Sequence, residues 1–142
     1  MSTVEESWGC APHGDTLLKI ADKVLSQMRP FFPDGVGQIN IFIDELPDEE
    51  TLEALYLDDP YALYGAYSGM TSALELHEIE ADARIWIYRL PILKHWVEAA
   101  DIALETLIAN VFLKEIASHY RWEDVMFEHV MVSANIPQIM FE

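Results

Sequence analysis

The chain lacks several features that define common protein classes. It has a single cysteine, Cys10, so it cannot form an internal disulfide, and a reducing compartment is expected. Basic residues are scarce, with 8 against 25 acidic ones, which gives a formal net charge of −17. A field of this sign repels nucleic-acid phosphates and anionic membranes, so we expect no direct binding to either.

Long apolar runs are missing as well. The longest apolar-looking segment, residues 102–113, is interrupted by Glu105 and Asn110 and is too short to cross a bilayer. Residues 1–15 are polar and acidic, with neither the basic start nor the apolar run of a signal peptide. The sequence therefore predicts a cytoplasmic protein.

The length and the apolar content of the chain are sufficient for one folded domain. Apolar residues make up 51% of the 142 residues and aromatic residues 11%, which is sufficient for a sizeable core. Residues 1–14 show little periodicity and are predicted to form a flexible N-terminal arm, ahead of a single domain over residues 15–142. No internal repeat or linker divides that domain.

Hydrophobic periodicity predicts an α+β fold. The first helix should be capped by Asp15 or Thr16 and ended by Pro30, and a turn should follow over residues 31–37. Asp48 is expected to cap a second helix at 49–56. Further helices are predicted at 91–97, 100–120 and 122–131. Strands are predicted at 39–43 and 84–89, and a loop running into a strand at 61–69. The tail to Glu142 is expected to pack against the body or a partner.

The long helix carries a carboxylate where an apolar residue is expected. At 100° per residue, an apolar stripe runs through Leu104, Leu107, Ile108 and Val111, and its continuation reaches Glu115. Burial of an unpaired carboxylate costs free energy. Either the helix end emerges into solvent, or the stripe opens into a cleft.

The same helix contains the frame of a zinc-peptidase motif. In His-Glu-x-x-His, two histidines four residues apart hold one zinc ion, and the glutamate acts as general base on the metal-bound water. Residues 114–120 read Lys-Glu-Ile-Ala-Ser-His-Tyr, so Glu115 is present while Lys114 and Ser118 occupy the ligand positions. A protonated lysine has no lone pair for zinc, and a serine hydroxyl is a poor zinc ligand.

Four segments in order resemble the small bacterial zincin-like metallopeptidase family, a minimal zincin. The first is the strand at 39–43 with the acidic residues 44–50. The second, Leu-Tyr-Gly-Ala-Tyr-Ser-Gly at 63–69, is similar to the family's Leu-x-Gly-x-Tyr-x-Gly. The third, Tyr-Arg-Leu-Pro-Ile at 88–92, is similar to Tyr-Arg-x-Pro-Ile, and the long helix follows. The resemblance covers residues 17–131 and implies a small β-sheet packed against helices, one of which carries the motif.

The resemblance also implies a role for each motif residue. The family signature is His-Glu-x-x-His-His-Phe-Gly, which falls on residues 114–121 with Tyr in place of Phe and Arg in place of Gly. Glu115 keeps the general-base position, His119 matches the third histidine, and Lys114 and Ser118 replace the first two. The chain is therefore predicted to be a degenerate member, with no metal cofactor, a vestigial Glu115 and no hydrolytic activity.

Two interpretations of the altered motif stay open. In the first, Lys114 pairs with Glu115 or another acid and replaces the positive charge of the metal. In the second, Glu115, His119 and Glu123 share a helical face, provided that the helix continues, and hold zinc or another divalent ion. Further donors to such an ion would come from Asp124, Glu128 or His129.

Acidic residues are concentrated in one segment, residues 44–59, which contains no Lys or Arg. They are Asp44, Glu45, Asp48, Glu49, Glu50, Glu53, Asp58 and Asp59, and a second cluster is Glu75, Glu78, Glu80 and Asp82. Three hypotheses apply: a solvated surface that keeps the protein soluble, a docking face for a basic protein partner, or an acidic mimic of nucleic acid that inhibits a basic partner. We favour an interaction or regulatory protein over a hydrolase with a non-standard metal set.

The other candidate residues give weaker evidence of a function. Tyr61, Tyr64 and Tyr67 recur every three residues and either pack locally or line a peptide groove. The segment that starts at His77 is interpreted as an exposed turn. Cys10 has no histidine pattern around it, so it is not predicted to be a nucleophile.

Overall fold

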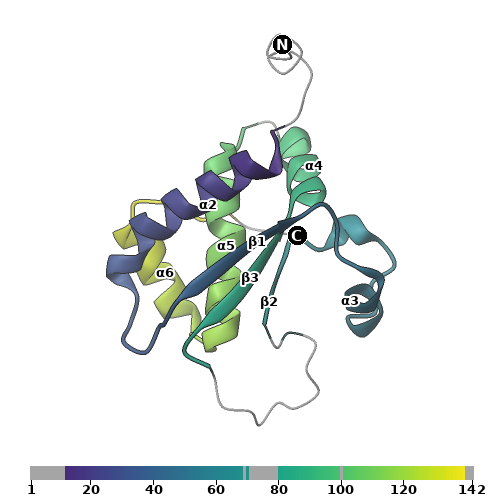
Figure 1. The fold of residues 1–142 in the computed structure, drawn as a ribbon. Helices are drawn as coiled ribbons and strands as arrows, with labels where there is room; N and C mark the ends of the chain where they lie inside the picture. Colours follow the sequence, from purple (N-terminus) through teal and green to yellow (C-terminus); the bar gives the residue numbers. More distant parts are fainter. Residues whose placement is uncertain (1–11, 69, 71–79, 100, 140–142) are drawn as a thin grey trace.

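The computed structural model describes residues 12–68, 70, 80–99 and 101–139 (Figure 1). Of the predicted arm, residues 1–11 lie outside this part, and Gly14 already belongs to the first helix. The elements, in chain order, are α2 (Gly14–Met28), a 3₁₀ turn (Arg29–Phe31), β1 (Ile39–Asp44), α3 (Glu49–Ala54), a 3₁₀ turn (Pro60–Ala62), β2 (Gly65–Tyr67), β3 (Ala83–Tyr88), α4 (Arg89–Ala99), α5 (Leu104–Tyr120) and α6 (Asp124–Ser133). The α+β prediction is confirmed.

The three strands form one small sheet in the order β1-β3-β2. β1 runs parallel to β3, with Ile41 opposite Ile85, while β2 runs antiparallel to β3, with Ala66 opposite Trp86. The stretch predicted as a loop running into a strand therefore supplies an edge strand. Both β1 and β2 are edges of this sheet.

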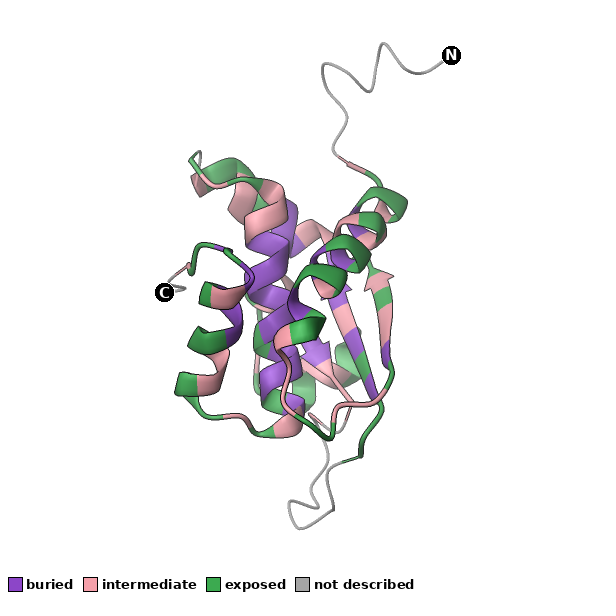
Figure 2. Cartoon of the chain, turned by 90° about the vertical axis from the view of Figure 1, so that its left-hand side faces the viewer, coloured by how far each residue is buried: buried purple, intermediate pink, exposed green. Residues whose placement is uncertain are grey.

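One face of the sheet packs against α2 and α5. Ile85 and Ile87 of β3 point to this face and are fully buried. Most residues of α5 are buried, because the helix packs against the sheet on one side and against α2, α4 and α6 on its other sides. Figure 2 shows α5 buried along its length, whereas α2 and α6 turn an exposed side to solvent. The long helix is thus the centre of the core.

The opposite face of the sheet carries the alternate residues of β1 and β3. Phe42 is 40% exposed there and stacks on Trp86, with ring centroids 5.2 Å apart. The guanidinium carbon of Arg84 lies 5.8 Å from the centroid of the Trp86 ring. This face is therefore aromatic and charged, and it is separate from the helical core.

Asn110 explains the polar interruption in the apolar segment of the long helix. It is 1% exposed, and its side-chain amide donates to the carbonyls of Thr106 (2.9 Å) and Pro137 (2.8 Å). Its side-chain oxygen accepts from the Ile139 N–H at 2.8 Å. The tail, as far as residue 139, therefore packs against α5, as expected for this segment.

Several element boundaries differ from the predictions. Arg89, predicted to end a strand, is the first residue of α4. Its side chain turns back to the carbonyl of Pro12 (2.6 Å) and to the carboxylate of Glu45 (2.8 Å). Pro91 lies in the first turn of α4, where an N–H has no partner within the helix, so the proline is tolerated there.

No helix in the described part of the chain is long and apolar enough to span a membrane.

Candidate functional site

The motif residues on α5 lie on two adjoining helical faces. Lys114 and Ser118, four residues apart, are both exposed. Glu115 and His119 lie on the next face and are only 8% and 9% exposed. The alternative of a helix end emerging into solvent is therefore wrong for Glu115, because its side chain is held inside the fold.

Glu115 lies directly beneath the edge strand β2. A Cβ atom built on Gly65 would be 3.1 Å from Cγ of Glu115, 3.1 Å from Cγ1 of Val111 and 3.0 Å from the carbonyl oxygen of Trp86. A side chain at position 65 would therefore be tightly packed, and its neighbours, among them Glu115, would have to shift by a few tenths of an ångström. The glycine at the centre of one sequence motif is thus the residue that packs on the glutamate of the other.

The surroundings of Glu115 favour its neutral form. Burial raises the pKa of this carboxyl from 4.5 to about 7, against the smaller opposing effect of the positive charge on Lys114. Its carboxylate makes no hydrogen bond to a described residue, and no fully buried polar side-chain atom of the described residues lacks a partner. The Glu115 oxygens therefore keep some contact with solvent.

Both ring nitrogens of His119 are used by the protein itself. The Nε2 lies 2.9 Å from the carbonyl oxygen of Glu80, which can only accept, so Nε2 carries the proton. In the neutral ring, Nδ1 then accepts from the hydroxyl of Ser68 at 3.3 Å. The Ser68 hydroxyl in turn accepts from the Arg84 N–H at 3.2 Å. His119 thereby ties α5 to the two chain positions, 68 and 80, that flank residues 69–79.

Glu123 does not share a helical face with Glu115 and His119. α5 ends at Tyr120, Arg121 adopts a left-handed conformation (φ 58°), and Glu123 is the exposed N-cap residue of α6. The continuous helix that the second interpretation requires is therefore absent. Asp124, Glu128 and His129 lie on α6, each with an exposed side chain.

Arg121 occupies the position where the signature of the resembling family has Gly. Its N–H is within reach of the carbonyls of Ala117 and Ser118, as in a helix C-cap, and glycine adopts the left-handed conformation without steric cost. We therefore expect Arg121→Gly to be more stable than Arg121→Ala by about 1 kcal/mol. Urea unfolding of the two variants measures the difference. Equal stabilities would show that the left-handed geometry costs nothing at this residue.

Comparison with known proteins supports the reading of these motifs. A family model described as zincin-like metallopeptidase matches residues 36–132, from the approach to β1 through most of α6. The chain belongs to the zincin-like metallopeptidase family. No curated protein and no solved structure matches it.

The donor set on α5 of this zincin-like chain does not fit a zinc ion. A catalytic zinc takes three protein ligands, usually His, Glu, Asp or Cys. The ligand positions hold Lys114 and Ser118, and His119 has both nitrogens in hydrogen bonds. Across the described part of the chain, no three His, Cys, Asp or Glu side chains are grouped so that they could hold a metal ion.

The tyrosines of this zincin-like chain have separate surroundings. The Tyr64 hydroxyl lies 3.1 Å from Nδ1 of His95 on α4, with the two rings nearly perpendicular. Tyr67 packs edge-on against His119, at 6.3 Å between ring centroids. Tyr64 and Tyr67 therefore each pack against a histidine, and the pairing of Tyr64 with His95 had no signal in the sequence. Cys10 and His77 lie outside the described residues.

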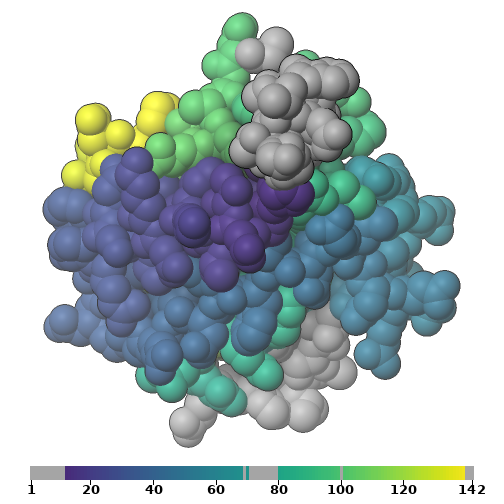
Figure 3. All heavy atoms as spheres, turned by 45° about the horizontal axis from the view of Figure 1, so that its top comes forward, coloured from purple at the N-terminus to yellow at the C-terminus, as the bar shows by residue number. Residues whose placement is uncertain are grey.

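The acidic segment 44–59 is exposed at all eight of its carboxylates. Asp48 caps α3 by accepting from the Thr51 N–H at 2.8 Å, and hydrogen bonds from the side chain and the N–H of Thr51 lower the pKa of Asp48. Asp59 accepts from the Tyr61 N–H at 3.0 Å. In Figure 3 the segment forms the blue-to-teal side of the molecule, away from the yellow helix α6. The capping bonds use two of the eight carboxylates and Glu45 pairs with Arg89, so the structure assigns no such bond to the other five.

Proposed function

We propose that this member of the zincin-like family acts by binding a basic protein partner rather than by zinc-dependent hydrolysis. The observation that carries the proposal is the state of the motif helix. The glutamate of the motif is kept and buried, while both ligand positions are occupied by exposed side chains that do not bind zinc. The family scaffold and the general-base glutamate are retained, but the two groups that would hold the zinc ion are replaced.

The electrostatics around Glu115 support a substitution of charge. In a zinc site, the metal's positive charge stabilises the anionic groups near it. Lys114 supplies a positive charge that lowers the pKa of Glu115, although burial outweighs this effect. A cation at this position preserves part of the local charge balance without providing a Lewis acid.

The acidic segment 44–59 supports a basic partner. Its eight exposed carboxylates include Glu49, Glu50 and Glu53 on α3. A surface of one charge sign steers an oppositely charged protein and suppresses binding to acidic ones. The α3 helix therefore offers a compact docking face.

Neutralising this face tests the proposal. We expect the triple variant Glu49→Gln, Glu50→Gln, Glu53→Gln to bind a short peptide of alternating lysine and glycine about tenfold more weakly than the wild type, which corresponds to about 1.4 kcal/mol. A control with the same change in net charge neutralises the exposed acids Asp22, Asp101 and Glu128. Titration by fluorescence anisotropy at low salt gives both affinities.

The control separates a local docking face from the overall charge. If both triple variants lose the same affinity, the segment has no special role and the proposal of a docking face fails. The hydrolytic alternative is tested separately by metal analysis of protein purified without chelator. Stoichiometric zinc that survives dialysis would contradict the non-hydrolytic part of the proposal.

A further inference from the structure

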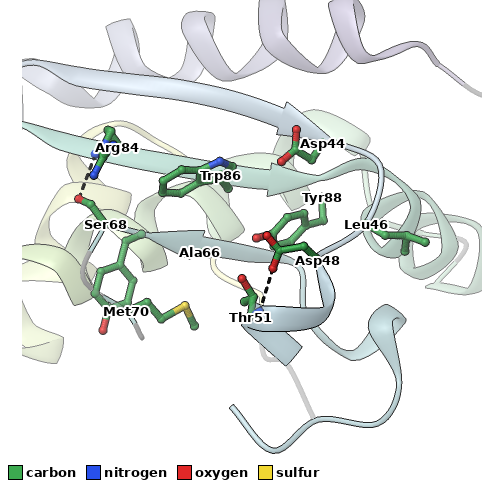
Figure 4. Close-up of a pocket in the computed structure, with 11 residues that line it drawn as sticks. Asp44, Leu46, Asp48, Thr51, Ala66, Ser68, Met70, Arg84, Trp86 and Tyr88 are labelled. Carbon is green, nitrogen blue, oxygen red and sulfur yellow. Dashed lines mark hydrogen bonds between the residues drawn. The ribbon is translucent and has the colours of Figure 1, made fainter. Parts of the chain in front are cut away.

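The face of the sheet opposite α5 contains a hollow of about 250 Å³. Its walls come from β2, β3, the end of β1 and the segment that enters α3 (Figure 4). Asp44, Asp48 and Tyr88 lie at one end, while Arg84 and Ser68 lie at the other. Trp86 stands between the two ends, so the hollow has an acidic end and a basic end.

Tyr88 is the group at the acidic end that the fold leaves unused. It is only 5% exposed, and its hydroxyl makes no hydrogen bond to a described residue although the side chain lines the hollow. Burial raises the pKa of Tyr88 to about 12, with further effects from the negative charges of Asp44, Asp48 and Glu115. The hydroxyl therefore stays protonated. No fully buried polar side-chain atom of the described residues lacks a partner, so this hydroxyl is accessible from the hollow, where a bound polar group could reach it.

Two carboxylates stand beside this hydroxyl. Asp44 is the register partner of Tyr88 across β1 and β3. Asp48 uses one carboxylate oxygen to cap α3, and hydrogen bonds from the side chain and the N–H of Thr51 lower its pKa. The acidic end thus offers three acceptor groups, two of them charged, around one space.

A primary ammonium matches this arrangement. It is a compact cation with three N–H donors, one for each acceptor group, and its alkyl stem can lie along the apolar wall. A guanidinium is planar and fits two parallel carboxylate oxygens better than three converging groups. Arg84, held near the Trp86 ring at the far end, keeps a second cation from settling there.

We propose that the acidic end of this hollow binds the side chain of a lysine presented by the partner. The inference rests on the proposed function, because it specifies how a basic partner is recognised. Exposed carboxylates on α3 attract the partner, while Tyr88, Asp44 and Asp48 hold one lysine at a defined position.

Binding of n-butylammonium, the lysine side chain alone, tests the site directly. We expect saturable shifts of the Trp86 indole N–H and of the β3 amides in NMR spectra, and none with the neutral alcohol n-pentanol. Tyr88→Phe, which removes an acceptor group, and Asp44→Asn, which removes a negative charge, should each weaken binding at least about fivefold. Asp58→Asn, an exposed acid of the same segment outside the hollow, should change it less than twofold. Asp48 is left intact because it caps α3.

The outcomes separate the site from the proposed function. If n-butylammonium produces no saturable shifts, or if Tyr88→Phe binds it like the wild type, the lysine site is refuted. n-Propylguanidinium binding as tightly as n-butylammonium would overturn the choice of lysine. If the lysine-glycine peptide still loses affinity in the α3 triple variant, but not in Tyr88→Phe, the docking face stands and only the lysine site falls. A peptide that does not bind the wild-type protein contradicts both.

Discussion

Replacing Glu115 by Gln is expected to stabilise the protein progressively as the pH rises from 4.5 to 8. The gain in the free energy of unfolding, relative to the wild type, should grow by about 3 kcal/mol over this range. The figure follows from the pKa, which burial raises from 4.5 to about 7, at about 1.4 kcal/mol per pKa unit. Glutamine has nearly the same shape and does not titrate.

The sign of this effect follows from where the proton is held. Below pH 4.5 the carboxyl is protonated in both states, and it makes no pH-dependent contribution. Between pH 4.5 and 7 the unfolded chain releases the proton while the folded protein keeps it, so rising pH stabilises the unfolded state relative to the folded state. Above pH 7 both states are ionised and the loss of stability is complete.

Urea unfolding at pH 4.5, 6 and 8 measures the effect as a difference between variant and wild type. Glu128→Gln, the same chemical change at an exposed position on α6, is the matched control. A constant difference across the three pH values would contradict the burial of an ionisable group at position 115. The expected result would also show that the chain keeps a carboxylate at a cost in stability.

The double substitution Lys114→His with Ser118→His should raise zinc affinity at least about a hundredfold over the wild type. Both positions are exposed and lie four residues apart on α5, so two imidazoles would share one helical face beside Glu115. A hundredfold gain corresponds to about 2.7 kcal/mol. Competition with a chromophoric chelator at neutral pH measures it.

The single variant Lys114→His is the control, because one added imidazole should give little of the gain. If the double variant binds zinc no better than the single one, positions 114 and 118 do not share a usable face. The third ligand position limits the zinc affinity that the double variant can reach. His119 would have to leave Ser68 and Glu80 to become a ligand, so the affinity should stay below that of a site with three free ligands.

The sequence was most informative where local periodicity decides the structure. The alternation over residues 39–43 and 84–89 predicted β1 and β3, and the long apolar pattern predicted α5 to within a few residues. Arg89 was assigned to a strand because alternation continues through it. In the structure Arg89 begins α4, and its side chain bonds to Pro12 and Glu45, which are distant in the sequence.

The parts that could not be predicted depend on contacts between distant segments. The stripe on α5 marked Glu115 as unusual, but its burial comes from the close approach of Gly65 on β2. His119 was a candidate ligand by its motif position, yet its hydrogen bonds go to Ser68 and Glu80, 51 and 39 residues away. The hollow around Tyr88 required the parallel pairing of β1 with β3, which no short pattern specifies.

The bonds of His119 also bear on how far a single substitution reaches. Ser68, which follows β2, and Glu80, which precedes β3, are both hydrogen-bonded to one imidazole on the central helix. Loss of this imidazole therefore removes two attachments at once, whereas removal of the Ser68 hydroxyl leaves the bond to Glu80 in place. The two segments that reach His119 are thus coupled through a single side chain of α5.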